Sequence, residues 1–84
     1  MVSNQIVRKG LGLGIRVYEP EPNVIRFSNY CEVLCEMELN KNGDWVGYLY
    51  PAHPYLVIHK VVGSKNFVAN QCLYYISQEI KKAL

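Results

Sequence analysis

The sequence feature that most constrains the fold is an alternating stretch that runs into a tight-turn signal. From residue 31 to residue 39, apolar side chains recur at every second position. Successive side chains of a strand point to opposite faces. One face of this strand would carry Cys31, Val33, Cys35, Met37 and Leu39. The other face would carry Glu32, Leu34, Glu36 and Glu38. Asn42-Gly43 follows, and this pair suits the positive φ angles of a hairpin turn. A β-hairpin is therefore predicted, with a second strand from Trp45 to Tyr50.

Further β-like segments flank this hairpin, and a helical pattern ends the chain. Residues 15–18, 24–27 and 55–62 are rich in β-branched and aromatic side chains, and Pro-rich connections precede two of them. After Gly63, either Ser64 or Asn66 is a candidate helix N-cap. Residues 66–83 are predicted to be helical, because one stripe at helical spacing holds Ala69, Cys72, Leu73, Ile76, Ile80 and Ala83.

The N-terminal residues 1–14 show neither pattern clearly. Glycine and leucine alternate from Gly10 to Gly14, and a strand-like segment rather than a helix follows. A dinucleotide-binding glycine loop requires the opposite order, so that interpretation is discarded. Residues 1–14 are predicted to form an N-terminal arm or an edge strand that packs closely against another backbone.

These elements define an α+β fold. We expect a four- to five-stranded, mostly antiparallel sheet within residues 15–62 and one C-terminal helix packed on one of its faces. A chain of 84 residues is long enough for a single domain. No apolar run approaches the roughly 18–20 residues of a membrane span, and the N-terminus lacks a signal-peptide core. The three cysteines, an odd number, favour a reducing compartment. The expected location is cytoplasmic, with no membrane contact.

The predicted sheet carries more apolar surface than one helix can cover. In the strand 45–50, Val46, Tyr48 and Tyr50 would share one face and Trp45 and Leu49 the other. The strand 55–62 is likewise apolar on both sides. Either the N-terminal segment folds over the second face, or a second copy of the chain or another protein covers it.

The aromatic residues of this region suggest what the spare face binds. Tyrosine and tryptophan are favoured anchors of protein interfaces. The candidate protein-binding residues, which cluster around the loop Pro51–Pro54, are Trp45, Tyr48, Tyr50, His53 and Tyr55. The sequence thus favours a small non-enzymatic module that binds another protein through an uncovered aromatic sheet face. Such a module would act as a subunit, adaptor or inhibitor of a larger complex, of the kind that viruses and plasmids also encode.

The alternative function is an RNA- or single-stranded-DNA-binding regulator. Tyrosine platforms flanked by basic residues hold single strands, and Arg26 could join the basic candidates, which are Arg8, Lys9, Arg16, Lys60 and Lys65. The net charge of +2 does not by itself require such a partner. The glutamates of residues 32–38 would repel phosphates if they share the face of the tyrosines.

Neither catalysis nor a bound group is expected. His53 and His59 have no nucleophile or paired carboxylate placed to complete a catalytic set. On a strand, Cys31 and Cys35 would lie roughly 13 Å apart, too far to share one metal ion. The sequence therefore predicts no cofactor, no metal site and no enzymatic activity.

Overall fold

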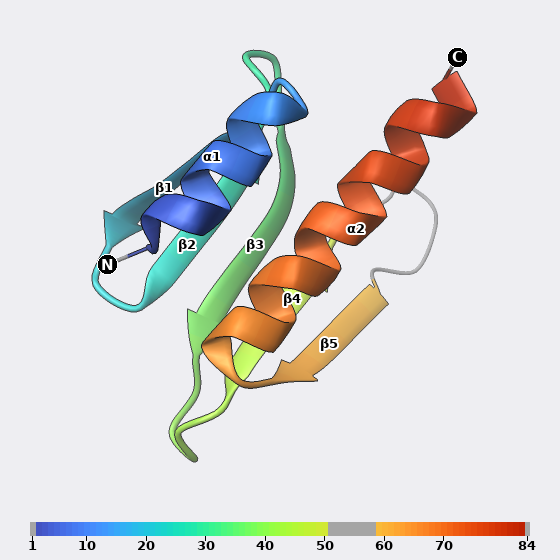
Figure 1. The fold of residues 1–84 in the computed structure, drawn as a ribbon. Coiled ribbons are helices and arrows are strands. Elements are labelled where there is room, and N and C mark those ends of the chain that lie inside the picture. Colours follow the sequence, from blue (N-terminus) through green and yellow to red (C-terminus); the bar gives the residue numbers. More distant parts are fainter. Residues whose placement is uncertain (1, 51–58, 84) are drawn as a thin grey trace.

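The computed structural model of the chain describes residues 2–50 and 59–83. In that part the chain forms a five-stranded antiparallel sheet with two helices (Figure 1). The elements in chain order are α1 (Asn4–Gly12), β1 (Arg16–Glu21), β2 (Val24–Ser28), β3 (Val33–Leu39), β4 (Trp45–Leu49), β5 (His59–Gly63) and α2 (Lys65–Ala83). Each strand pairs with the next one along the chain, in the order β1-β2-β3-β4-β5. The predicted α+β class and the C-terminal helix packed on the sheet are confirmed.

The turn between β3 and β4 forms where the Asn-Gly signal predicted it. The side-chain oxygen of Asn40 accepts hydrogen bonds from the backbone N–H groups of Asn42, at 2.9 Å, and Asp44, at 3.0 Å. Gly43 has a φ of +86°, a conformation that only glycine adopts without strain. These contacts set the register in which Leu39 faces Trp45.

The N-terminal segment is a helix, so the prediction of an arm or edge strand is wrong. Ser3 caps α1, because its side-chain oxygen accepts a hydrogen bond from the N–H of Ile6 at 3.3 Å. Ile6 and Gly10, four residues apart, are the buried positions of the helix. A Cβ atom on Gly10 would lie 2.6 Å from Cγ2 of Val17, so glycine permits close packing of α1 on β1. This tertiary packing outweighs the low helix propensity of the glycines.

Both helices lie on the same face of the sheet (Figure 1). α1 packs against β1, α2 crosses β3, β4 and β5, and the two helices touch each other. Between the helices and the sheet lies the core, whose largest fully buried side chains are Phe27, Ile25, Met37, Ile76, Val68, Cys35 and Cys72. The N-terminal segment therefore does not fold over the second face of the sheet, which was one of the two expected ways of covering that face.

The C-terminal helix matches its prediction closely. It begins at Lys65, one residue before the predicted boundary. Ser64 is the N-cap, because its hydroxyl accepts a hydrogen bond from the N–H of Phe67 at 3.2 Å. Four residues of the predicted stripe are buried against the sheet, namely Ala69, Cys72, Leu73 and Ile76. Neither of the helices described here is long and apolar enough to cross a membrane.

Strand β3 differs from its prediction at its beginning. It starts at Val33, while Cys31 is exposed in a turn where the side chain of Asn29 accepts hydrogen bonds from the N–H groups of Cys31 and Glu32. The register with β2 shifts between Phe27 and Ser28, which introduces an irregularity of the β-bulge type. As a result Leu34 packs against the core instead of lying on the glutamate face. For the last predicted strand, residues 59–62 lie in β5, and residues 55–58 lie outside the described part.

Candidate functional site

The face of the sheet opposite the helices, here called the outer face, carries a continuous row of polar and aromatic side chains. Directly opposed residues of neighbouring strands share a face. The register aligns one residue from each strand, and this set, the outer row, consists of Tyr18, Arg26, Glu36, Tyr48 and Lys60. A second aligned set on this face consists of Val24, Glu38, Val46 and Val62. No helix or strand described in residues 2–50 and 59–83 crosses this face.

Two charged groups of the outer row, Arg26 and Glu36, are paired across the strands. Nε of Arg26 donates a hydrogen bond to Oε2 of Glu36 at 2.7 Å, and both side chains remain partly exposed. The pKa of Arg26 is raised, chiefly by this hydrogen bond and the charge of Glu36, and further by the Tyr18 hydroxyl. The guanidinium carbon of Arg16 lies 4.7 Å from the centre of the Tyr18 ring, in cation–π geometry. Opposite charges and ring contacts therefore hold this part of the outer face in one arrangement.

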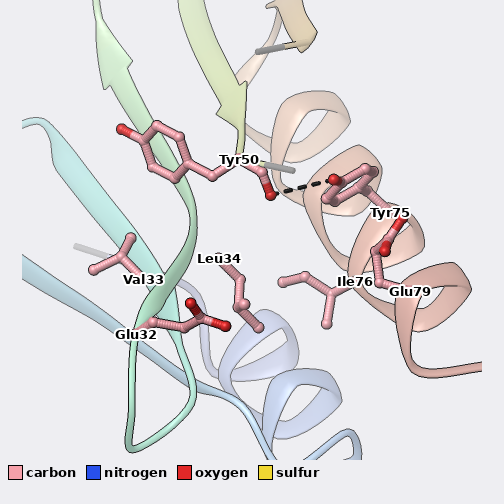
Figure 2. A pocket seen from close by; sticks show the side chains of 7 residues that line it. All are labelled: Glu32, Val33, Leu34, Tyr50, Tyr75, Ile76 and Glu79. Carbon is pink, nitrogen blue, oxygen red and sulfur yellow. Dashed lines mark hydrogen bonds between the residues drawn. The ribbon is translucent and has the colours of Figure 1, made fainter. Parts of the chain in front are cut away.

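Tyr48 and Tyr50 lie together beside this ion pair. The Tyr48 hydroxyl donates a hydrogen bond to Oε1 of Glu38 at 3.3 Å, and partial burial, followed by the charge of Glu38, raises the Tyr48 pKa. The pKa of Tyr50 is also raised, first by burial and then by the charge of Glu36, while Arg26 opposes the shift. Figure 2 shows the Tyr50 ring pointing away from α2. Two of the predicted protein-binding tyrosines thus occupy the same corner of the outer face.

Trp45 does not belong to this surface, which corrects the prediction that it is an exposed anchor. Its side chain is 8% exposed and is part of the core. Its strand partners are Leu39 and Gly63, and the Nζ atom of Lys65 lies 5.3 Å from the centre of the Trp45 ring. The alternation of β4 places Trp45 and Tyr48 on opposite faces, and the helices cover the face of Trp45. His53 and Tyr55, the other predicted anchors, lie outside the described residues.

The basic residues of the nucleic-acid alternative do not form one surface. Arg16 and Lys60 are on the outer face, whereas Arg8 and Lys9 are on α1 and Lys65 begins α2. Nζ of Lys9 donates a hydrogen bond to Oδ1 of Asn70 on α2, at 3.2 Å. Because the helices cover the other face of the sheet, the two groups of cations are separated by the sheet itself.

The glutamates of β3 do share the face of the tyrosines. Glu36 lies between Arg26 and Tyr48, and Glu38 lies between Val24 and Val46. This is the arrangement that sequence analysis named as an obstacle to phosphate binding. Tyr18 is the member of the outer row that sequence analysis missed. Tyr18 lies three residues before Glu21, whereas its partner Arg26 lies only two residues after Val24, because the register shifts between Tyr18 and Glu21. Counting residues from the turn would therefore not have aligned the two.

A cavity of about 150 Å³ opens beside this corner, between the start of β3, the end of β4 and the C-terminal half of α2 (Figure 2). Its lining residues are Glu32, Val33, Leu34, Tyr50, Tyr75, Ile76 and Glu79. The Tyr75 hydroxyl donates a hydrogen bond to the backbone carbonyl of Tyr50 at 3.2 Å. This bond ties α2 to the end of β4, and the cavity here is called the end pocket.

The Tyr75 phenol makes the folding stability depend on pH in the alkaline range. Burial first, and the charge of Glu79 second, raise its pKa, so the folded protein holds this proton to a higher pH than the unfolded chain does. The contribution of this protonated phenol to the free energy of unfolding is fully present below about pH 10, near the pKa of tyrosine in an unfolded chain. It is lost as the pH rises through the higher pKa of the folded protein. Above about pH 10, the free energy of unfolding of Tyr75→Phe should fall less steeply than that of the wild type. Urea unfolding at a series of pH values measures both slopes, and equal slopes would contradict the assignment.

Within the described residues, no group of three or more histidine, cysteine, aspartate or glutamate side chains is placed to hold a metal ion. Cys35 and Cys72 are buried, and a hydrogen bond with Cys72 together with burial raises the pKa of the Cys35 thiol, which disfavours a reactive thiolate. No known protein family, curated protein or solved structure with which we compared the chain matches it.

Proposed function

We propose that this chain is a small non-enzymatic protein-binding module that acts as a subunit, adaptor or inhibitor of a larger complex through its outer face. The observation that carries the proposal is the outer row, which crosses all five strands while both helices occupy the opposite face. A setting in the cytoplasm fits the three free cysteines.

The side chains of the outer row suit a protein partner. Tyrosines supply large contact areas with few rotatable bonds, and such residues often dominate binding energy. The ion pair of Arg26 with Glu36 and the hydrogen bond of Tyr48 with Glu38 already restrict these side chains before binding. Ordering them on association therefore costs less conformational entropy.

The charge pattern favours a protein over nucleic acid, and it disfavours a contact between two copies that is centred on β3. The phosphate backbone of a nucleic acid requires a continuous positively charged surface, whereas here glutamates lie among the cations. β3 is the central strand, so a two-fold axis along β3 would bring Glu36 and Glu38 against their own copies, whereas an axis between β2 and β3 would bring Glu36 against Arg26. Like charges in such contact are destabilising, and a different protein with complementary charges avoids them.

Capture of partners from a lysate of the native source tests the proposal, with the wild type and two tyrosine variants as baits. Tyr48→Ala alters the outer row, and Tyr74→Ala is the matched control, because Tyr74 is a 63% exposed tyrosine on α2. We expect a stoichiometric protein that survives nuclease treatment, is retained by Tyr74→Ala and is lost from Tyr48→Ala.

The other outcomes each contradict the proposal. Partners that disappear with nuclease and leave RNA or DNA behind would assign the chain to nucleic-acid binding. A protein retained equally by both variants would place the binding surface elsewhere. A bait that captures only its own second copy would make the outer face a dimer contact.

A further inference from the structure

We infer that the end pocket receives the side chain of a lysine or arginine from the protein partner. This inference rests on the proposed function and names a contact within it. Three features carry it: the size of the pocket, the combination of apolar walls with two carboxylates, and its continuity with the outer face.

The size of the end pocket fits one side chain. Sites for drug-sized ligands occupy about 300–1,000 Å³. The end pocket has about 150 Å³, which is enough for a single long side chain and too little for a cofactor. A protruding side chain of a bound protein is thus the occupant that its volume favours.

The chemistry of the lining selects a basic side chain. Leu34 and Ile76 form apolar walls, and both pack with the core. In Figure 2 the Glu32 side chain extends toward Leu34, and Glu79 lies beside Tyr75. Lysine and arginine combine an apolar stem with a cationic head, so the stem can contact the walls while the head meets the carboxylates. The Tyr75 ring adds a face on which a guanidinium can stack.

Tyr50 connects the end pocket with the outer face. Its carbonyl, held by the Tyr75 hydroxyl, faces the pocket, and its ring points away from α2 (Figure 2). The charges of Glu36 and Arg26 act on its phenol, which places the ring near the outer row. A protein bound across Tyr48 and Tyr50 would therefore lie next to the end pocket, where one of its side chains can enter.

Small probes test the pocket without any protein partner. We would titrate the isotope-labelled full chain with n-butylguanidinium at low ionic strength and follow the backbone amides by NMR. The neutral n-butylurea, which has nearly the same shape, is the matched probe. We expect saturable shifts at Leu34, Ile76 and Glu79, with a dissociation constant on the order of millimolar. Binding of n-butylurea should be at least about fivefold weaker.

Variants of the same shape separate charge from packing. The double substitution Glu32→Gln with Glu79→Gln should weaken binding of n-butylguanidinium by about fivefold. The control Glu21→Gln, at an exposed glutamate of the edge strand β1, should leave binding unchanged. Absence of saturation, equal binding of both probes, or equal affinity of the double variant and the wild type would each overturn the inference.

This outcome is independent of the proposed function. Tyr48→Ala should still bind n-butylguanidinium as the wild type does, although it should lose the protein partner. A pocket that fails this test leaves the capture experiment unaffected. Conversely, a capture experiment that contradicts binding through the outer face would leave the binding of n-butylguanidinium to the end pocket unchanged.

Discussion

Phe27→Ala should lower the free energy of unfolding by about 3–5 kcal/mol, because it leaves a cavity at the centre of the core. Phe27 is 0% exposed and is the largest fully buried side chain among the described residues. Small domains are stable by only about 5–15 kcal/mol, so this single change could remove much of the total. Urea unfolding followed by circular dichroism measures the loss.

Phe67→Ala is the matched control for this prediction. Phe67 is the same residue type in the first turn of α2, but its side chain is 50% exposed. Its truncation should cost about 1 kcal/mol, because half of the apolar surface is in water already. If both variants lost equal stability, the core would not lie between the sheet and the two helices.

Gly47→Ala should destabilise the protein by about 1–3 kcal/mol, because α2 sits directly on this residue of β4. A Cβ atom on Gly47 would lie 2.6 Å from Cγ1 of Val68 and 3.3 Å from Sγ of Cys72. Val68 is β-branched and fully buried, so it cannot turn away easily. Either α2 must move outward or the strand must bend.

A second substitution gives this prediction a specific test. In Gly47→Ala, the further change Val68→Ala removes the methyl group that the new Cβ would strike. The double variant should therefore lose less stability than the sum of the two single variants. Thermal or urea unfolding of the four proteins provides the comparison. Additive losses would show that Gly47 does not limit the approach of α2.

The hairpin of β3 and β4 and the helix α2 could be predicted from sequence, because local patterns specify both. The residues from Asn40 to Asp44 make the hydrogen bonds of the turn among themselves. The apolar stripe of α2 requires only one surface to pack against. α1 could not be predicted in the same way. Only Ile6 and Gly10 are its buried positions, and the reason for Gly10 is its contact with Val17, seven residues later in the chain.

The site was only partly predictable, because it depends on long-range register. The sequence placed Tyr48 and Trp45 on opposite faces, but both faces of β4 are apolar, so it could not show which face the helix covers. Gly47 settles that question, since its missing side chain admits α2 on the face of Trp45. The alignment of Tyr18 with the other members of the outer row follows from the pairing of all five strands.

The dissociation constant of the captured partner protein tests the central claim most directly, with the wild type, Tyr48→Ala and Tyr74→Ala compared at one salt concentration. If the outer face binds the partner, Tyr48→Ala should raise the constant by about 30-fold, the effect of losing an interface anchor worth about 2 kcal/mol. Tyr74→Ala, on the helical side, should change it by less than about threefold. A larger effect of Tyr74→Ala than of Tyr48→Ala would move the interface to the helices and contradict the account.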